Sequence, residues 1–201
     1  MMQPSHSPGI AALPDVVAYI GLCGVTAAGA WIDLRTQRVP NRLTYWAMLG
    51  ALVFWAVAGG FTGGLAGAWH GWLAAFGGLL AGLIPYMILV FAFGGLGGGD
   101  AKLMGVVGAL TASWLGVVQV SFYAMLAALC MAVWLMVRKG LIRRTASRVF
   151  SAVLLKAMRA KPAMQYDDSP QIPFALAIAV GAAVGGAEVL LKIRMPWSGY
   201  M

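Results

Sequence analysis

Long apolar runs constrain this chain more than any other feature of its sequence. The runs cover residues 16–32, 43–58, 69–93, 103–137 and 172–193. A Gly-rich connection without charge, 59–67, is predicted between the second and third runs. A helix that crosses the hydrocarbon core of a bilayer needs about 20 apolar residues. Hydrophobic residues make up 61% of the chain and charged residues only 10%, which leaves too few polar side chains to cover a water-facing surface. The sequence therefore predicts an all-α polytopic membrane protein with no separate soluble domain.

The run 103–137 decides the number of crossings. It is shorter than the roughly 40 residues that two full spans need, but charge favours two helices. Lys102 precedes the run and a basic cluster starting at Arg138 follows it, and both have the charge that is typical of cytoplasmic helix ends. An even number of crossings is then required. We predict two helices with a turn between Thr111 and Gly116, and about six transmembrane helices in all.

The basic residues also predict the orientation, because positively charged loops remain in the cytoplasm. With six helices, 12 of the 14 Lys and Arg residues fall in the first, third and fifth loops, which places the N- and C-termini outside. The net charge of +8 reflects this topology, and no nucleic acid is expected as a partner. The 12 residues are Arg35, Arg38, Arg42, Lys102, Arg138, Lys139, Arg143, Arg144, Arg148, Lys156, Arg159 and Lys161.

The segment 138–171 is the longest charged part of the chain. Apolar residues in it recur at helical spacing, and Arg144, Arg148 and Arg159 fall on the opposite face. Such a basic amphipathic helix suits an anionic lipid surface. The alternative is an irregular cytoplasmic loop whose charges only enforce the topology. In both interpretations, residues 1–201 form one membrane-embedded domain.

Two acidic residues, Asp33 and Asp100, lie where an apolar helix meets the predicted cytoplasmic interface. Ionisable residues at membrane depth usually face the interior of the protein or a water-filled cavity. Two carboxylates that meet there share a proton, because both cannot ionise easily. The ionised member can then activate a water molecule, and the protonated member can donate to a carbonyl oxygen. The pair is therefore suited to peptide hydrolysis.

Each aspartate has a structural alternative when it is taken alone. Asp33 could be an interfacial anchor balanced by Arg35, and Asp100 could cap a helix N-terminus. Asp100 ends the tetrapeptide Gly97-Gly98-Gly99-Asp100, whose glycines leave room for a substrate backbone. After Asp33 comes Val39-Pro40-Asn41, in which Pro40 separates two helices and Asn41 can cap the second.

These motifs resemble the type IV prepilin peptidases, which are membrane aspartyl peptidases of the Gly-x-Gly-Asp type. The resemblance rests on Asp33-x5-Val39-Pro40-Asn41, on the segment from Gly95 to Leu103, and on Ile172-Pro173-Phe174, in that order. It implies that Asp33 and Asp100 are the catalytic residues. It also implies supporting or substrate-binding roles for Gly97, Gly99, Lys102, Pro40 and Asn41.

The resemblance implies a substrate and a location as well. The substrate is a prepilin or pseudopilin, whose short basic leader is removed after Gly at the cytoplasmic face of a bacterial inner membrane. Larger family members carry an N-terminal cysteine-rich zinc region that is linked to N-methylation. Only 32 residues precede Asp33 here and no CxxC pair is present. The chain is thus similar to the short form found with Flp-type (tight-adherence) pili, which cleaves without methylating.

No metal or cofactor is expected, because Cys23 and Cys130 lie in separate apolar runs without a Cys/His cluster. Two other classes of function are compatible with these features. A small transporter would use the two aspartates as a proton or cation relay, although transporter sites usually lie near the midplane. A structural subunit of a secretion machine would need neither aspartate.

Overall fold

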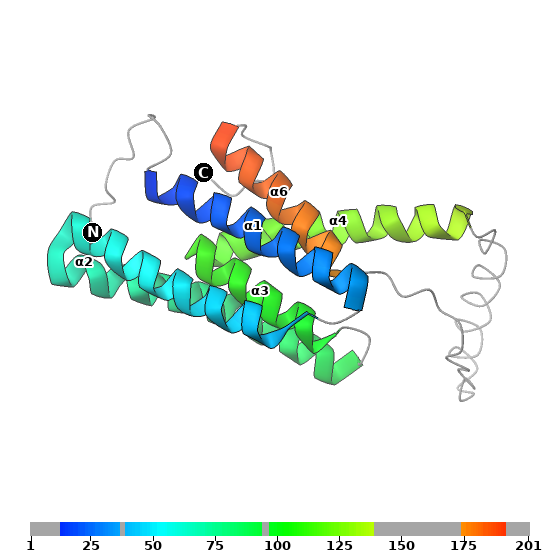
Figure 1. Ribbon diagram of the computed structural model, residues 1–201, viewed down its shortest axis with the longest axis horizontal. Helices are drawn as coiled ribbons and strands as arrows, with labels where there is room; N and C mark the ends of the chain where they lie inside the picture. The colour runs from blue at the N-terminus through cyan, green and yellow to red at the C-terminus, as the bar shows by residue number, and fades with distance from the viewer. Residues whose placement is uncertain (1–12, 37–38, 94–96, 139–173, 192–201) are drawn as a thin grey trace, which may run out of the picture. The chain divides into compact units, whose positions relative to one another are not determined.

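The computed structural model describes residues 13–36, 39–93, 97–138 and 174–191, and within them all regular structure is helical (Figure 1). Helices α1, α2 and α4 are each long and apolar enough to cross a membrane. The prediction of an all-α membrane protein is therefore confirmed, whereas the count of six spans and the side of the termini remain predictions. The helices are α1 (Leu13–Thr36), α2 (Asn41–Phe93), α3 (Gly98–Thr111), α4 (Trp114–Arg138) and α6 (Phe174–Leu191).

Helix α2 is a hairpin of two helical arms rather than one straight helix. Its backbone leaves the helical conformation at Gly63 and at Gly64, where φ is 59°, a value that glycine adopts without a Cβ clash. The predicted division of 43–93 into two helices is therefore correct. The predicted connection at 59–67 is too long, because most of its residues continue the two arms and only the central pair breaks them.

The two arms of α2 pack against each other through glycine. A Cβ atom added at Gly59 would overlap the backbone of Gly67, and one added at Gly71 would overlap the carbonyl group of Trp55. These pairs show that the arms run antiparallel. In membranes, such small residues let helix backbones approach closely and gain van der Waals contact.

The long apolar run after Lys102 contains two helices, as predicted. Helix α3 ends at Thr111, Ala112 adopts a left-handed conformation with φ 46°, and α4 begins at Trp114. Ser113 starts the second helix, since its side-chain oxygen accepts a hydrogen bond from the backbone N–H of Gly116 at 3.4 Å. The break lies inside the predicted turn between Thr111 and Gly116.

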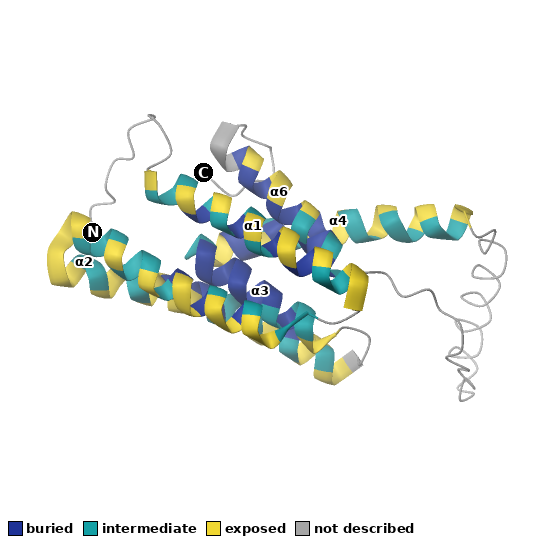
Figure 2. Cartoon of the chain, viewed as in Figure 1, coloured by how far each residue is buried: buried dark blue, intermediate teal, exposed yellow. Residues whose placement is uncertain are grey.

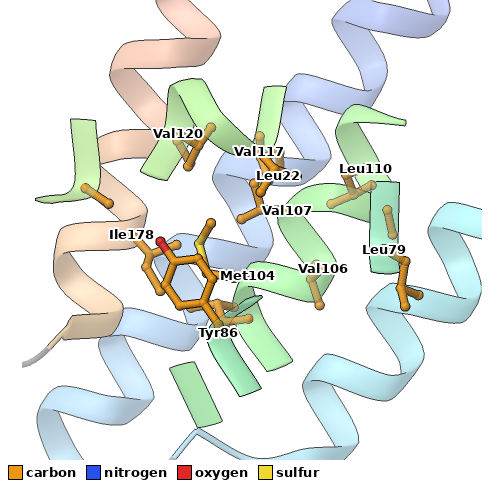
Figure 3. Packing of buried hydrophobic residues seen from close by; sticks show 14 of the residues in the cluster. Leu22, Leu79, Tyr86, Met104, Val106, Val107, Leu110, Val117, Val120 and Ile178 are labelled. Atoms are coloured by element: carbon orange, nitrogen blue, oxygen red, sulfur yellow. The ribbon is translucent and has the colours of Figure 1, made fainter. Parts of the chain in front are cut away.

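Helix α3 forms the centre of the core, and nine of its 14 residues are buried (Figure 2). Its neighbour on one side is the second arm of α2, whose Gly78 and Gly82 meet the backbone of Gly108 and Met104. On another side it contacts α1. Figure 3 shows how side chains of several helices meet around it. Those labelled there are Leu22, Leu79, Tyr86, Met104, Val106, Val107, Leu110, Val117, Val120 and Ile178.

Helix α6 packs along α1 and along the first half of α4. Cβ atoms added at Gly186 and Gly181 would meet Tyr19 of α1 and the backbone of Ala124 of α4, respectively. A polar contact joins α6 to α4, because the buried carboxylate of Glu188 accepts hydrogen bonds from Gln119 at 2.7 Å and from Tyr123 at 2.6 Å. Two donors thus compensate the burial of this acidic group.

The last part of α4 belongs to a second compact unit, Leu126–Ile172, of which only 126–138 is described. Apolar side chains such as Leu129 and Val133 are exposed in it, and the guanidinium of Arg138 lies 4.9 Å from the centroid of the Trp134 ring. Tryptophan and arginine near a helix end are typical of a membrane interface. Beyond Arg138, the predicted basic segment 138–171 lies outside the described residues.

Candidate active site

Both aspartates singled out in the sequence line one pocket of about 450 Å³. Asp33 comes from the C-terminal end of α1, and Asp100 comes from the first turn of α3. Two segments from separate parts of the chain therefore build a single cavity. Its lining residues are Asp33, Val39, Pro40, Asn41, Gly97, Gly98, Gly99 and Asp100.

The contact between α1 and α3 brings Asp33 to this pocket. A Cβ atom added at Gly29, one helical turn before Asp33, would lie 3.3 Å from Cδ1 of Leu103. Leu103 is fully buried and follows Asp100 by three residues. Residues three or four apart lie on the same helix face. This close contact therefore places Asp33 on the face of α1 that packs on α3, and Asp100 on the face of α3 that packs on α1.

The position of Asp33 is not explained by charge pairing with Arg35. The guanidinium of Arg35 lies over the ring of Trp31, 4.5 Å from its centroid. In this geometry the cation is attracted to the face of the aromatic ring. Asp33 is half-buried and lines the pocket. The interpretation of Asp33 as an anchor balanced by Arg35 therefore does not describe the position of this carboxylate.

The start of α3 holds Asp100. Gly97 is the N-cap residue, with extended backbone, and its carbonyl oxygen accepts a hydrogen bond from the N–H of Asp100 at 3.0 Å. A Cβ atom added at Gly97 would lie 3.3 Å from Oδ2 of Asp100. Asp100 thus belongs to the first helical turn and is not the N-cap, which corrects the capping interpretation of this residue.

Gly99 brings the segment after α1 against the start of α3. A Cβ atom added there would lie 3.1 Å from Cβ of Val39, which is closer than side chains normally pack. Val39 and its neighbour Pro40 both line the pocket. The lack of a side chain at Gly99 therefore lets the Val39-Pro40-Asn41 segment reach Asp100.

Asn41 and Lys102 form a second link between these segments. The ammonium group of Lys102 donates a hydrogen bond to Oδ1 of Asn41 at 2.8 Å and lies 5.3 Å from the centroid of the Tyr45 ring. Asn41 is the first residue of α2, and the carbonyl of Pro40 accepts from the N–H of Leu43 at 3.1 Å. The prediction that Asn41 caps α2 is therefore wrong, because Asn41 is already the first helical residue and Pro40 stands before it.

The electrostatics of Asp100 differ from those of a solvated carboxylate. Burial, followed by the negative charge of Asp33, raises the pKa of Asp100 to about 6, and a hydrogen bond from the backbone of Gly97 lowers it in part. Burial and a like charge both disfavour ionisation of a carboxyl group. Asp100 therefore holds a proton more readily than a free aspartate does.

Sequence reasoning found most of the residues around this pocket. Asp33, Asp100, Pro40, Asn41, Gly97 and Gly99 line it, whereas Lys102 contacts Asn41 from its side. Reasoning from the sequence did not assign roles to Gly98 and Tyr45. Tyr45 could have been found, because it follows Asn41 by four residues and so shares its helix face. Among the described residues, no group of three or more His, Cys, Asp or Glu side chains could hold a metal ion.

The model of the type IV leader peptidase family matches residues 20–135, which is more than half of the chain and includes both aspartates. The chain belongs to this family. The peptidase is therefore a membrane protease of the aspartic type, and its substrates are of the prepilin kind. Comparison with curated proteins and with solved structures gave no match.

The raised pKa of Asp100 predicts how the stability of the peptidase depends on pH. A carboxyl whose pKa rises on folding, from 3.8 to about 6, favours the folded state below pH 4 and loses that contribution as the pH rises through 6. At pH 8, Asp100→Asn should be more stable than the wild type by about 1–2 kcal/mol, after allowance for the partial exposure of the carboxyl. Thermal unfolding in detergent at pH 4 and pH 8 measures this, and equal differences at both pH values would contradict it.

A second prediction concerns Lys102. Since its ammonium group holds Asn41 beside the pocket, Lys102→Met should lower the cleavage rate about 3–10-fold by loosening the Pro40 side of the pocket. Lys102→Arg should restore most of the rate, because it can donate to the same oxygen. The pH dependence of stability that Asp100 causes should not change in Lys102→Met. Tyr45→Phe keeps the aromatic face and is the control. A shifted pH dependence in Lys102→Met would instead assign Lys102 a direct effect on Asp100.

Proposed function

We propose that the peptidase removes the short basic leader of a prepilin or pseudopilin at the cytoplasmic face of a bacterial inner membrane. It would cut after Gly and would not methylate the new N-terminus. The observation that carries this proposal is the single pocket in which Asp33 and Asp100 meet. Family membership supports the general activity, and the resemblance to the short, Flp-type form supports cleavage alone.

In the proposed mechanism, Asp33 and Asp100 are the catalytic residues. Ionised Asp33 accepts a proton from a water molecule, whose oxygen attacks the carbonyl carbon of the scissile peptide bond. Asp100, whose raised pKa favours its acid form, donates its proton to the carbonyl oxygen. When the tetrahedral intermediate collapses, the C–N bond breaks. The amine then takes the proton from Asp33, and Asp100 recovers a proton from the hydroxyl group.

The proposed topology has six spans, with both termini outside. The C-terminal end of α1, the start of α2 and the start of α3 all contribute to the pocket. These three helix ends carry Arg35, Arg42 and Lys102, as expected for the cytoplasmic side. The basic segment 138–171 would bind anionic lipid on the same side. The scissile bond would then lie at the interface, just before the hydrophobic helix of the substrate.

Mass spectrometry of a prepilin co-expressed with the peptidase tests this proposal. The expected product begins directly after a Gly at the boundary between the basic leader and the hydrophobic helix, and its N-terminus is unmodified. A cut within the hydrophobic helix would refute the interfacial position of the site. A methyl group that depends on the peptidase alone would refute cleavage without methylation. An unprocessed prepilin would favour the alternative of a transporter or a structural subunit.

A further inference from the structure

Three consecutive glycines precede Asp100, and the structure gives each of them different surroundings. A Cβ atom added at Gly97 would approach the carboxylate of Asp100 to 3.3 Å, and one added at Gly99 would approach Val39 to 3.1 Å. A Cβ atom at Gly98 would meet no other atom within 4 Å. Gly98 nevertheless lines the pocket and is exposed. The space beside its Cα is therefore open and belongs to the site.

The backbone at Gly98 does not require glycine. Gly98 is the first residue of α3, and among the described glycines only Gly64 has a positive φ. Any residue can adopt the conformation of the first helical turn, and most have a higher helix propensity than glycine. Neither the backbone conformation nor packing thus explains the absence of a side chain at this position, in contrast to Gly99.

We propose that Gly98 determines the substrate specificity of the site. This inference rests on the proposed function, because it concerns the residue on the leader side of the scissile bond. The pocket wall at position 98 consists of backbone alone, so it leaves room next to Asp100 for a substrate residue somewhat larger than Gly. The peptidase therefore accepts Ala or Ser on the leader side of the cut as well as Gly, and a side chain at position 98 would remove this tolerance.

Cleavage of two prepilins that differ only in this residue, Gly or Ala, tests the proposal in the wild type and in Gly98→Ala and Gly98→Leu. In the wild type, kcat/KM for the Ala substrate should lie within about tenfold of that for the Gly substrate. In Gly98→Leu, the ratio of Gly to Ala cleavage should rise by a further 10-fold or more, because a methyl group in a filled pocket is discriminated by about 10–200-fold. Gly98→Ala should give an intermediate ratio.

Gly50→Leu is the matched control, because a Cβ atom at Gly50 also meets nothing within 4 Å and Gly50 does not line the pocket. Its Gly-to-Ala ratio should equal that of the wild type. The proposal is overturned if Gly98→Leu lowers cleavage of both substrates equally, or if its ratio is unchanged. These outcomes differ from a failure of the proposed function, in which the wild type would cleave neither prepilin.

Discussion

Asp33→Asn and Asp100→Asn should each lower the rate of leader cleavage by about 10³-fold or more. In the proposed mechanism, each change removes one of the two groups that exchange protons with water and with the scissile carbonyl. Both carboxyls line one pocket and act as a unit in that mechanism, so the double variant should be no less active than either single one. The amount of prepilin processed per unit time, normalised to the amount of membrane-inserted peptidase, measures the effect.

Asp15→Asn provides the control for the loss of a carboxylate from the same helix. Asp15 lies in the first turn of α1, and Asp33 lies near its last turn, so about 27 Å of helix separates them. This variant should cleave at the wild-type rate. Substantial cleavage by either Asp33→Asn or Asp100→Asn would exclude the proposed acid–base pair, and a loss of inserted protein in both would indicate a structural role instead.

Gly78→Leu should prevent the protein from folding correctly. A Cβ atom at Gly78 would overlap the carbonyl oxygen of Gly108 in α3, and a backbone atom within a helix cannot turn aside as a side chain can. We expect a loss of about 3 kcal/mol or more in stability. The yield of detergent-extracted peptidase and its thermal unfolding temperature measure this loss. Cleavage should disappear with the folded protein, since α3 carries Asp100.

Gly77→Leu is the control for this substitution, because it adds the same side chain to the preceding residue of the same helix. Gly77 is exposed, and a Cβ atom there would meet nothing within 4 Å. Its yield and unfolding temperature should match those of the wild type. Equal losses in both variants would point to a general effect of leucine on α2, whereas normal folding of Gly78→Leu would contradict the close packing of α2 on α3.

The helices of this protein follow from its hydrophobic runs, but the role of its glycines does not. The break near Ala112 could be predicted, because charge at both ends of 103–137 required an even number of crossings. The stretch 59–67 was predicted to be a connection, because glycine has a low helix propensity. In the structure most of it is helical, since close packing of the two arms outweighs that propensity. Such tertiary packing cannot be read from the sequence of one segment.

The two aspartates could be located in the sequence because charged groups are rare in apolar surroundings. Their neighbours were harder to assign. The bond between Lys102 and Asn41 joins residues that are 61 positions apart, and no local pattern links them. The three glycines before Asp100 form one repetitive stretch in the sequence, yet the fold gives Gly97, Gly98 and Gly99 different neighbours. Only the three-dimensional arrangement separates the glycine that packs from the one that faces open space.

The length of α3 has a consequence for the biogenesis of the peptidase. With 14 residues, α3 is shorter than the roughly 20 residues that a helix needs to span the bilayer core. Its glycine contacts with the second arm of α2 supply the partner that it needs. The two should therefore enter the bilayer together as a helical hairpin. In the proposed six-span topology, Asp100 therefore reaches its place beside the end of α1 only after this joint insertion.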